Sequence, residues 1–222
     1  LREKETLLRE IHHRVKNNLN IIASLLSLQA GQVKDPRVTD AFSESKARII
    51  SIALVHEKLY ESRDLSQISF GAYLTELANG LLSTFGISQG PIRVDVEADD
   101  IWLAVDAAIP CGLIVSELIT NCLKHAFTGR PSGRILVSMA ELGSEYRLTV
   151  SDNGIGFPEN INVQQTKTLG LQLVTTLVRQ LGGRISVKNE GGAEFEIRFE
   201  RRETNRIANR VAWIKKPTLA VS

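Results

Sequence analysis

Apolar residues recur along the first sixty positions at the spacing of two amphipathic helices. In the first segment they lie three or four residues apart, as one helical stripe: Leu8, Ile11, Val15, Leu19, Ile22 and Leu26. This pattern predicts a helix over about 3–30, which Gly31 ends. Asp35-Pro36 begins a second helix, with proline in its first turn. The second stripe comprises Val38, Ala41, Phe42, Ile49, Ile52, Ala53, Leu59 and Tyr60.

A short connection between two long amphipathic helices predicts an antiparallel hairpin. Together the two stripes are wider than a single hairpin can bury. We therefore expect two hairpins to pair into a four-helix bundle, most simply as a homodimer. His56 falls on the second stripe and is interpreted as a packed core histidine.

Beyond position 70 the pattern changes to helices alternating with short strands. Helices are predicted over 70–85, 107–127 and 169–181, and strands over 92–96, 135–140, 146–151, 184–189 and 194–199. The strands over 135–140 and 146–151 should pair antiparallel across a short turn. The predicted fold class is α+β: an antiparallel helical hairpin, then an α/β sandwich whose mixed, mostly antiparallel sheet is covered by helices on one face.

These patterns divide the chain into a hairpin over 1–66, an α/β domain over 67–200 and a basic tail over 201–222. The tail has six basic residues and one acidic residue between Arg201 and Lys216. We expect it to be an appended helix or a disordered end. Subtracting its +5 from the net charge of +2 leaves −3 for the remaining residues, so no broad basic surface for nucleic acid is expected.

Composition favours a globular protein, since 43% of the 222 residues are hydrophobic and 23% are charged. No apolar run reaches the roughly 20 residues of a membrane span, so no membrane contact is expected from this region. Because the sequence starts at Leu1, we expect an upstream sensor domain, which could attach the full-length protein to a membrane. Cys111 and Cys122 share one side of a predicted helix and are interpreted as core residues in a reducing compartment, the cytoplasm.

The first helix presents a histidine on its polar side. At about 100° per residue, His13 points roughly 160° away from the apolar stripe, whereas His12 lies only about 60° from it. Glu10 and Asn17 share the outer face with His13, because residues three and four apart are neighbours on a helix. His12 is therefore interpreted as a packing residue and His13 as an exposed imidazole, which is either an ordinary surface group or a phosphate acceptor.

Four polar side chains gather within about a 100° arc of the helix over 107–127, opposite its apolar side. They are Glu117, Asn121, Lys124 and His125. An amide oxygen such as that of Asn121 suits Mg²⁺, which keeps most of its waters and shares phosphate oxygens. One turn earlier, Glu117 can orient a metal-bound water, and Lys124 can neutralise phosphate charge. Alone, the pattern would equally fit a solvated helix face.

Two glycine-containing segments follow the polar helix. In Asp152-Asn153-Gly154-Ile155-Gly156-Phe157, the glycines allow close approach to a flat base, and Asp152 can accept the adenine amino proton. In Thr168-Leu169-Gly170-Leu171, a helix begins, and its free N–H groups suit phosphate. Each segment alone is also compatible with an ordinary turn or helix start. Their order along the chain favours a nucleotide site.

These motifs together resemble those of sensor histidine kinases whose acceptor box reads HRVKNN, which are related to the HWE kinases. The similarity covers about 3–200. It rests on the acceptor box at 13–18, the ELITNCLKHA segment at 117–126 (the N box), the first glycine box at 152–157 and TLGLQLV at 168–174. The resemblance implies a dimerisation and phosphoacceptor hairpin followed by the ATP-binding sandwich of gyrase-, Hsp90- and MutL-type ATPases.

The resemblance also implies a role for each matching residue. His13 would be the phosphoacceptor, Asn121 the Mg²⁺ ligand and Asp152 the adenine reader. Phosphate contacts would come from Lys124, His125 and the amides of Gly170 and Leu171, in a pocket shaped by Gly154, Gly156 and Gly170. The expected reaction is ATP-dependent autophosphorylation of His13, followed by transfer to an aspartate on a response-regulator receiver domain.

The sequence departs from the broader kinase pattern at two positions. Arg14 follows the acceptor histidine, where most kinases carry an acidic residue that assists proton removal, so Glu10 is our candidate proton acceptor. Ala193 stands where a threonine usually supports adenine binding. Two rivals to the autokinase remain: a serine kinase or ATPase of the same fold, and a degenerate kinase that serves as a docking scaffold.

Overall fold

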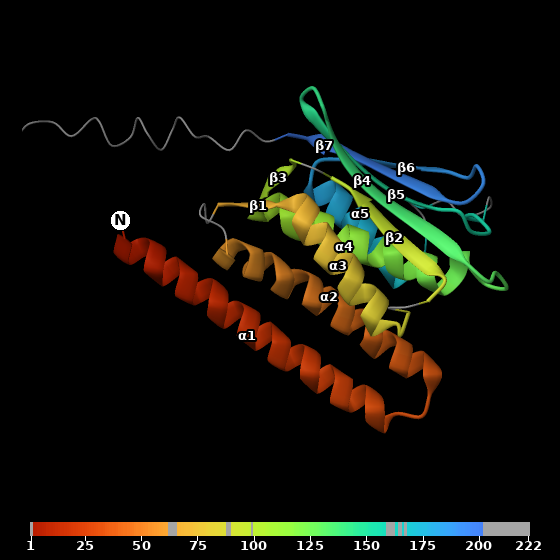
Figure 1. Ribbon diagram of the computed structural model, residues 1–222, viewed down its shortest axis with the longest axis horizontal. Coiled ribbons are helices and arrows are strands. Elements are labelled where there is room, and N and C mark those ends of the chain that lie inside the picture. Colours follow the sequence, from red (N-terminus) through yellow and green to blue (C-terminus); the bar gives the residue numbers. More distant parts are fainter. Residues whose placement is uncertain are drawn as a thin grey trace, which may run out of the picture.

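The computed structural model describes residues 2–61, 66–87, 90–98, 100–158, 163, 166 and 168–201. Its elements stack in layers, with a two-helix hairpin at one side, three further helices in the middle and a five-stranded sheet at the other side (Figure 1). This arrangement confirms the predicted α+β class, with a helical hairpin and a mixed sheet covered on one face. The interpretation of the tail beyond Arg201 falls outside the described residues.

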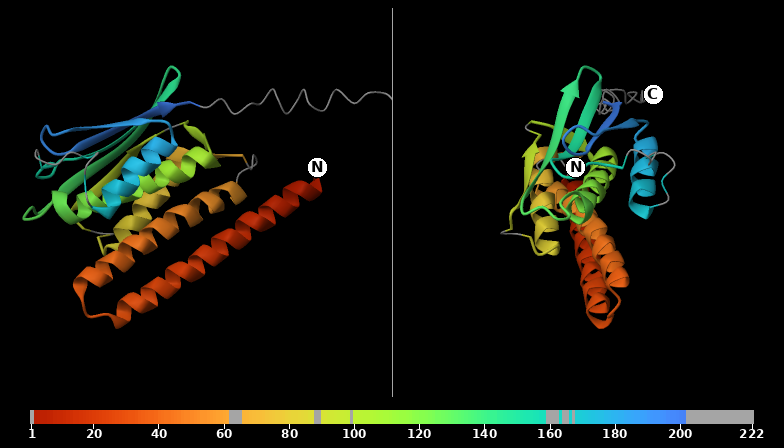
Figure 2. Two further views of the ribbon diagram at one scale, coloured as in Figure 1. Left: turned by 180° about the vertical axis from the view of Figure 1, so that it is seen from behind. Right: turned by 90° about the vertical axis from the view of Figure 1, so that its right-hand side faces the viewer.

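The hairpin consists of α1 (Arg2–Gln32) and α2 (Pro36–Glu61). Asp35 begins α2: its side-chain oxygen accepts the Arg37 N–H at 2.9 Å, and its carbonyl oxygen accepts the N–H groups of Val38 and Thr39. The two helices run antiparallel, as Figure 2 shows from two further sides. The predicted hairpin is confirmed, with a connection of three residues. Helix α1 does not end at Gly31 as expected, because it continues through that residue to Gln32.

The sheet contains β2 (Ile92–Glu97), β4 (Gly133–Leu142), β5 (Glu145–Asp152), β6 (Arg184–Lys188) and β7 (Glu194–Glu200), in the order β2-β4-β5-β7-β6. Only β2 and β4 pair in parallel; the other neighbours are antiparallel. The helices α3 (Phe70–Thr84), α4 (Val105–Asn121) and α5 (Leu169–Gln180) cover one face of this sheet (Figure 1). All five predicted strands are present, within a few residues of their expected bounds.

A two-stranded sheet joins the hairpin to the sandwich and was absent from the expectation. Its strands are β1 (Gln67–Ser69) and β3 (Trp102–Ala104), which pair antiparallel. Each strand has three residues, too few for a period-two pattern to stand out in the sequence. Their pairing spans more than thirty positions and therefore depends on the tertiary fold.

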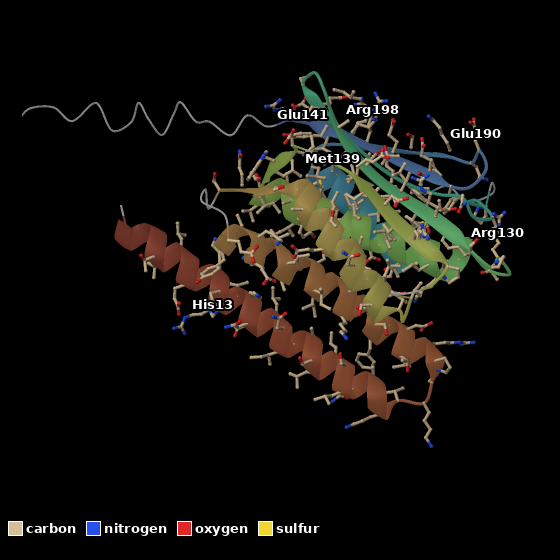
Figure 3. The ribbon with its side chains drawn as sticks, in the orientation of Figure 1. His13, Arg130, Met139, Glu141, Glu190 and Arg198 are labelled. Atoms are coloured by element: carbon tan, nitrogen blue, oxygen red, sulfur yellow. The ribbon has the colours of Figure 1, made fainter. Side chains whose placement is uncertain are left out.

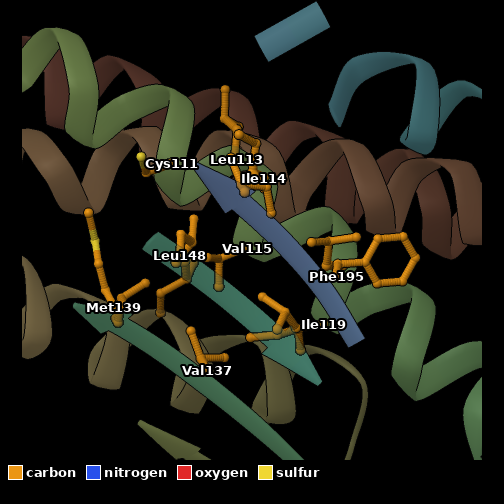
Figure 4. Close-up of a cluster of buried hydrophobic side chains, with 14 of the residues drawn as sticks. Cys111, Leu113, Ile114, Val115, Ile119, Val137, Met139, Leu148 and Phe195 are labelled. Atoms are coloured by element: carbon orange, nitrogen blue, oxygen red, sulfur yellow. The ribbon is translucent and has the colours of Figure 1, made fainter. Parts of the chain in front are cut away.

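The core lies between α4 and the sheet. Alternate residues of the strands point inward, as the period of two requires, and meet the apolar side of α4 (Figure 4). The buried side chains in this layer include Ile114, Val115 and Ile119 from the helix and Val137, Leu148 and Phe195 from the strands. Cys111 and Cys122 are both buried and free, in agreement with their interpretation as core residues.

The same core extends into the hairpin. Ala47, Val55 and Leu59 of α2 are buried within it, and the Ser51 hydroxyl hydrogen-bonds that of Tyr73 from α3 at 2.8 Å. Helix α2 thus packs against the α/β domain on one side and against α1 on the other. In the described chain, one helical stretch is long and apolar enough to cross a membrane, Val105–Ala126, and 67% of it is buried inside the fold.

Candidate active site

The helix that carries the N box changes its winding at the motif. Helix α4 ends at Asn121 and continues as η1, a π-helix over Cys122–Ala126 that includes Lys124 and His125. Single π-turns of this kind within α-helices are often found at functional sites. Glu117 and Asn121 therefore lie on the α-helix, whereas Lys124 and His125 lie on the π-helix. Periodicity alone did not predict this change.

Two of the four polar residues on this helix contact α2. Glu117 accepts two hydrogen bonds from the Arg48 guanidinium, at 2.5 Å from Nε to Oε1 and 2.8 Å from the terminal nitrogen to Oε2. Lys124 donates to Glu44 Oε1 at 2.7 Å. Asn121 is half-buried, and its side chain makes no hydrogen bond within the described chain, whereas His125 is exposed.

Asp152 lies at the end of β5, directly above the π-turn. Its Oδ1 accepts the N–H of Gly154 at 2.8 Å and that of Ala193 at 3.4 Å, while its Oδ2 accepts the Cys122 thiol at 3.4 Å. The thiol pKa is raised well above its ordinary value, first by burial and then by the Asp152 charge. Asp152 is thus contacted by this neutral thiol and by the amide of Ala193, the residue that stands where the kinase pattern usually has threonine.

The glycine box after Asp152 packs against the π-turn. A side chain at Gly154 would collide with the carbonyl oxygen of Ala126, and the next residue, Ile155, donates its N–H to that oxygen at 2.9 Å. Gly156 has φ of +84°, a conformation that favours glycine. The loop is held by Asn189, which accepts the Phe157 N–H at 2.9 Å and donates to the Phe157 carbonyl at 2.7 Å.

The second glycine box begins α5 next to Glu117. Thr168 is the residue preceding the helix, Gly170 lies in its first turn and Leu171 is buried. A Cβ on Gly170 would lie 2.7 Å from Glu117 Oε2. The start of α5 therefore lies beside the carboxylate of Glu117, so all three motifs meet around one helix.

His13 is exposed on α1, on the side turned away from the sheet (Figure 3). Its Nδ1 lies 3.4 Å from the Asn17 amide nitrogen, one turn along the helix, and its ring centroid lies 5.7 Å from that of Tyr60. This exposure agrees with the prediction from helical angles that His13, and not His12, points outward. The structure does not bring His13 beside the nucleotide motifs, which lie beyond α2.

His12 faces the other helix of the hairpin. Its Nδ1 lies 2.9 Å from Nδ1 of His56, and both rings are half-buried. Burial lowers both pKa values, and the charge of His12 lowers that of His56 further. Both were interpreted as packing residues, which agrees with this contact, although His56 is only partly enclosed.

Glu10, our candidate proton acceptor, is exposed and pairs with Arg14 at 2.6 Å. The pair joins residues four apart on one helix face. The residue that departs from the kinase pattern, Arg14, is thus paired with the candidate proton acceptor. The role of Glu10 stays a prediction.

Sequence reasoning missed four residues that shape this region: Glu44, Arg48, Cys122 and Asn189. Glu44 and Arg48 are four apart on α2 and have the spacing of an ordinary surface pair. Their contacts join positions 69 and 80 apart in the chain. Only knowledge of how α2 packs on α4 could have revealed them.

Comparison with known proteins agrees with this architecture. Residues 10–85 match a family model described as histidine kinase, and residues 106–203 match the histidine kinase-, DNA gyrase B- and HSP90-like ATPase model. The solved histidine kinase domain of the blue-light activated histidine kinase EL346 from Erythrobacter litoralis is 31% identical, with a TM-score of 0.64. The match covers 90% of this chain and 95% of that one. The chain belongs to the histidine kinase family.

Two relatives found by sequence are longer than the region that they share with this chain. Blue-light-activated histidine kinase 2 of Erythrobacter litoralis is 35% identical over 198 residues, which cover 85% of this chain and 55% of the relative. The sensor histidine kinase PdtaS of Mycobacterium tuberculosis is 33% identical over 199 residues, which cover 88% of this chain and 39% of the relative. The chain thus spans about half or less of these relatives.

Proposed function

We propose that this chain is the catalytic region of a two-component sensor kinase, in which ATP phosphorylates His13. The observation that carries the proposal is the meeting of the N box and both glycine boxes around α4 and η1, in a chain whose first helix exposes a histidine. The contacts among Glu117, Asp152 and Gly170 and their neighbours support a single nucleotide site. Membership of the histidine kinase family supports the same function.

In the proposed reaction, an imidazole nitrogen of His13 attacks the γ-phosphorus of ATP in line with the leaving oxygen. A nitrogen–phosphorus bond forms, the bond from the γ-phosphorus to the bridging oxygen breaks, and ADP leaves with that oxygen. The imidazole proton passes to a base, for which Glu10 is our candidate. Positioning and electrostatic stabilisation supply most of the rate enhancement in such transfers.

The residues around Asn121 fit a magnesium ion. Its amide oxygen is a hard ligand without another hydrogen bond in the described chain, and Glu117 lies one turn earlier on the same helix. When bound with ATP, Mg²⁺ would neutralise charge on the phosphate oxygens. Lys124 and the amides of Gly170 and Leu171 would then hold the phosphates, while Asp152 would accept the adenine amino proton.

His13 must meet a phosphate donor and then a phosphate acceptor. Its position on the outer side of α1 makes it accessible to a partner, and we propose that this partner is the receiver domain of a response regulator (Figure 3). We also propose that two copies pair through an apolar side of α1, about 90° around the helix from His13, which exposes Leu7, Ile21, Leu25 and Leu28. An upstream sensor domain and a cytoplasmic location complete the proposal, since ATP is the phosphate donor.

The decisive experiment is incubation with γ-labelled ATP and Mg²⁺, followed by mapping of the acid-labile phosphate. We expect the label on His13, lost in His13→Gln and retained in His12→Gln, which serves as the matched control. Label on serine or threonine would favour a serine kinase of the same fold. Nucleotide binding with no labelling would favour the docking scaffold.

A further inference from the structure

Two side chains of α2 occupy the N-box residues that the proposed reaction needs. The Arg48 guanidinium contacts both carboxylate oxygens of Glu117, at 2.5 and 2.8 Å. One turn earlier on α2, the Glu44 carboxylate accepts a hydrogen bond from Lys124 at 2.7 Å. The hairpin thus contacts the nucleotide motif through these two oppositely charged pairs, and Asp40 of α2 also lies 3.9 Å from the Lys124 ammonium.

The Arg48–Glu117 pair is sheltered from water, and it is linked to the Glu44–Lys124 pair. The side chain of Arg48 is 16% exposed and that of Glu117 only 7%, so salt screens their attraction less than it would at the surface. The hydrogen bond that Arg48 donates to Glu117 is the leading influence on Arg48 and raises its pKa. Glu44 also contacts Arg48 at 3.5 Å, so the two pairs form one charge-alternating cluster.

Each of the two α2 side chains has the same sign of charge as the part of a magnesium nucleotide that would contact its partner residue. An anion, Glu44, contacts the lysine assigned to phosphate. A cation, Arg48, contacts the carboxylate assigned to the metal's water, and that carboxylate also faces Gly170 at the start of α5. Phosphate and Glu44 would therefore compete for Lys124, while metal and Arg48 would compete for Glu117.

The surroundings of Glu44 leave room for its side chain to move while α2 stays in place. Ala47 and Ser51, on the adjoining turns of α2, are buried against the ATPase-like domain and hold the helix in place. Beside the Glu44–Lys124 pair lies an open cavity of about 460 Å³, lined by Arg37, Asp40, Ala41, Glu44, Lys124 and His125. Glu44 therefore has space to leave Lys124 without displacement of α2.

We propose that Glu44 and Arg48 are positioning residues of the nucleotide site, which hold Lys124 and Glu117 until the magnesium nucleotide replaces them. This inference rests on the proposed function and adds two residues from the phosphoacceptor hairpin to it. Because coupling between two sites is reciprocal, nucleotide binding would also loosen this contact of α2. Nucleotide binding would then alter the contact of the hairpin, and a change in the hairpin would alter the affinity for nucleotide.

The test is calorimetric titration of the full chain with MgADP, which binds without phosphoryl transfer. Glu44→Gln keeps the shape of the side chain and removes its charge, so we expect the dissociation constant to fall by about fivefold. Glu76→Gln is the matched control, since Glu76 pairs with Lys58 at another contact of α2 and should leave binding unchanged. In a Lys124→Met background, the gain from Glu44→Gln should disappear.

Unchanged or weaker MgADP binding by Glu44→Gln would overturn the competition. A gain that persists in the Lys124→Met background would overturn it too, because the effect would then come from general loosening of the fold. If the unmodified chain bound no MgADP, the proposed nucleotide site itself would be wrong and this inference with it. Normal binding without the gain would refute this inference alone.

Discussion

Asp152 is fixed by three donors before any base arrives. Its Oδ1 accepts the N–H groups of Gly154 and Ala193, and its Oδ2 accepts the buried thiol of Cys122. The carboxylate therefore has little freedom to rotate. Its oxygens are oriented by the backbone of two loops that lie far apart in the sequence, and this preorganisation lowers the cost of binding a base.

We predict that Asp152→Asn weakens MgADP binding by about tenfold or more, the loss expected when a charged hydrogen-bond acceptor is replaced by a group that cannot accept at the same position. The amide oxygen can keep the two backbone bonds, but its NH₂ group would then face the Cys122 thiol and the adenine amino group. Calorimetry measures the affinity. Asp95→Asn is the control, because Asp95 pairs with Arg134 on the exposed sheet, and a loss there of similar size would contradict the prediction.

Local sequence patterns predicted the surroundings of some individual residues and not of others. His13 could be distinguished from His12 by helical angle alone, and the structure agrees, with one ring exposed and the other against His56. Arg48 could not be recognised in the same way. Its charge and spacing are those of many solvated residues, and only the packing of α2 on α4 turns it into a partner of Glu117.

At the scale of elements, the hairpin contains a pair of histidines whose protonation opposes folding. His12 and His56 share a hydrogen bond for which one nitrogen donates and the other accepts, so a second proton would break it. Lys16, on the next turn of α1, adds positive charge, while Glu57, which pairs with Lys16 across the hairpin, offsets it. Burial lowers the pKa of both histidines, hence the folded hairpin binds protons less readily than the unfolded chain.

Stability should therefore fall as pH drops through the ordinary histidine pKa of about 6.5 toward the lowered values of the folded state. Above that range both rings are neutral in either state and the penalty is absent. Melting temperatures measured from pH 7.5 to 5 test this. His56→Gln should show a shallower decline than the unmodified protein, and parallel curves for the two would show that the pair does not contribute.

Helices and strands were predictable because their periods survive in the sequence. The start of α2 at Pro36 and the alternating burial of β4 and β7 follow from proline geometry and the pleat. The π-turn at Cys122–Ala126 and the short β1–β3 pair did not follow. Each depends on contacts that the surrounding fold makes, such as the hydrogen bond from Ile155 to Ala126.

At the scale of the whole molecule, α1 has an apolar side that one chain leaves uncovered. Leu25 is 55% exposed and Leu28 is 66% exposed, and Ile21 adds to the same surface. Exposed apolar area of this extent usually marks an interface. The family relationship and the width of the two helical stripes both favour a second hairpin as its occupant.

We predict that the unmodified chain sediments as a dimer and that Leu25→Glu shifts it to monomer, because a charge would be buried in the apolar interface. Analytical ultracentrifugation over a concentration series measures the mass. Asn20→Glu adds the same charge at an exposed polar position about 140° around α1 from Leu25 and should stay dimeric. A monomeric unmodified chain would disprove the pairing.

The sequence by itself determined the long helices, the strands of the five-stranded sheet and the class of fold, because local periodicity encodes them. It also contained the acceptor and nucleotide motifs, which resemblance to a family made recognisable. The tertiary structure alone decided how the parts contact one another. It placed Glu44 and Arg48 of the hairpin on Lys124 and Glu117, and it set the Cys122 thiol and the Ala193 amide on Asp152. These contacts join distant positions through packing, and no local pattern encodes which surfaces will meet.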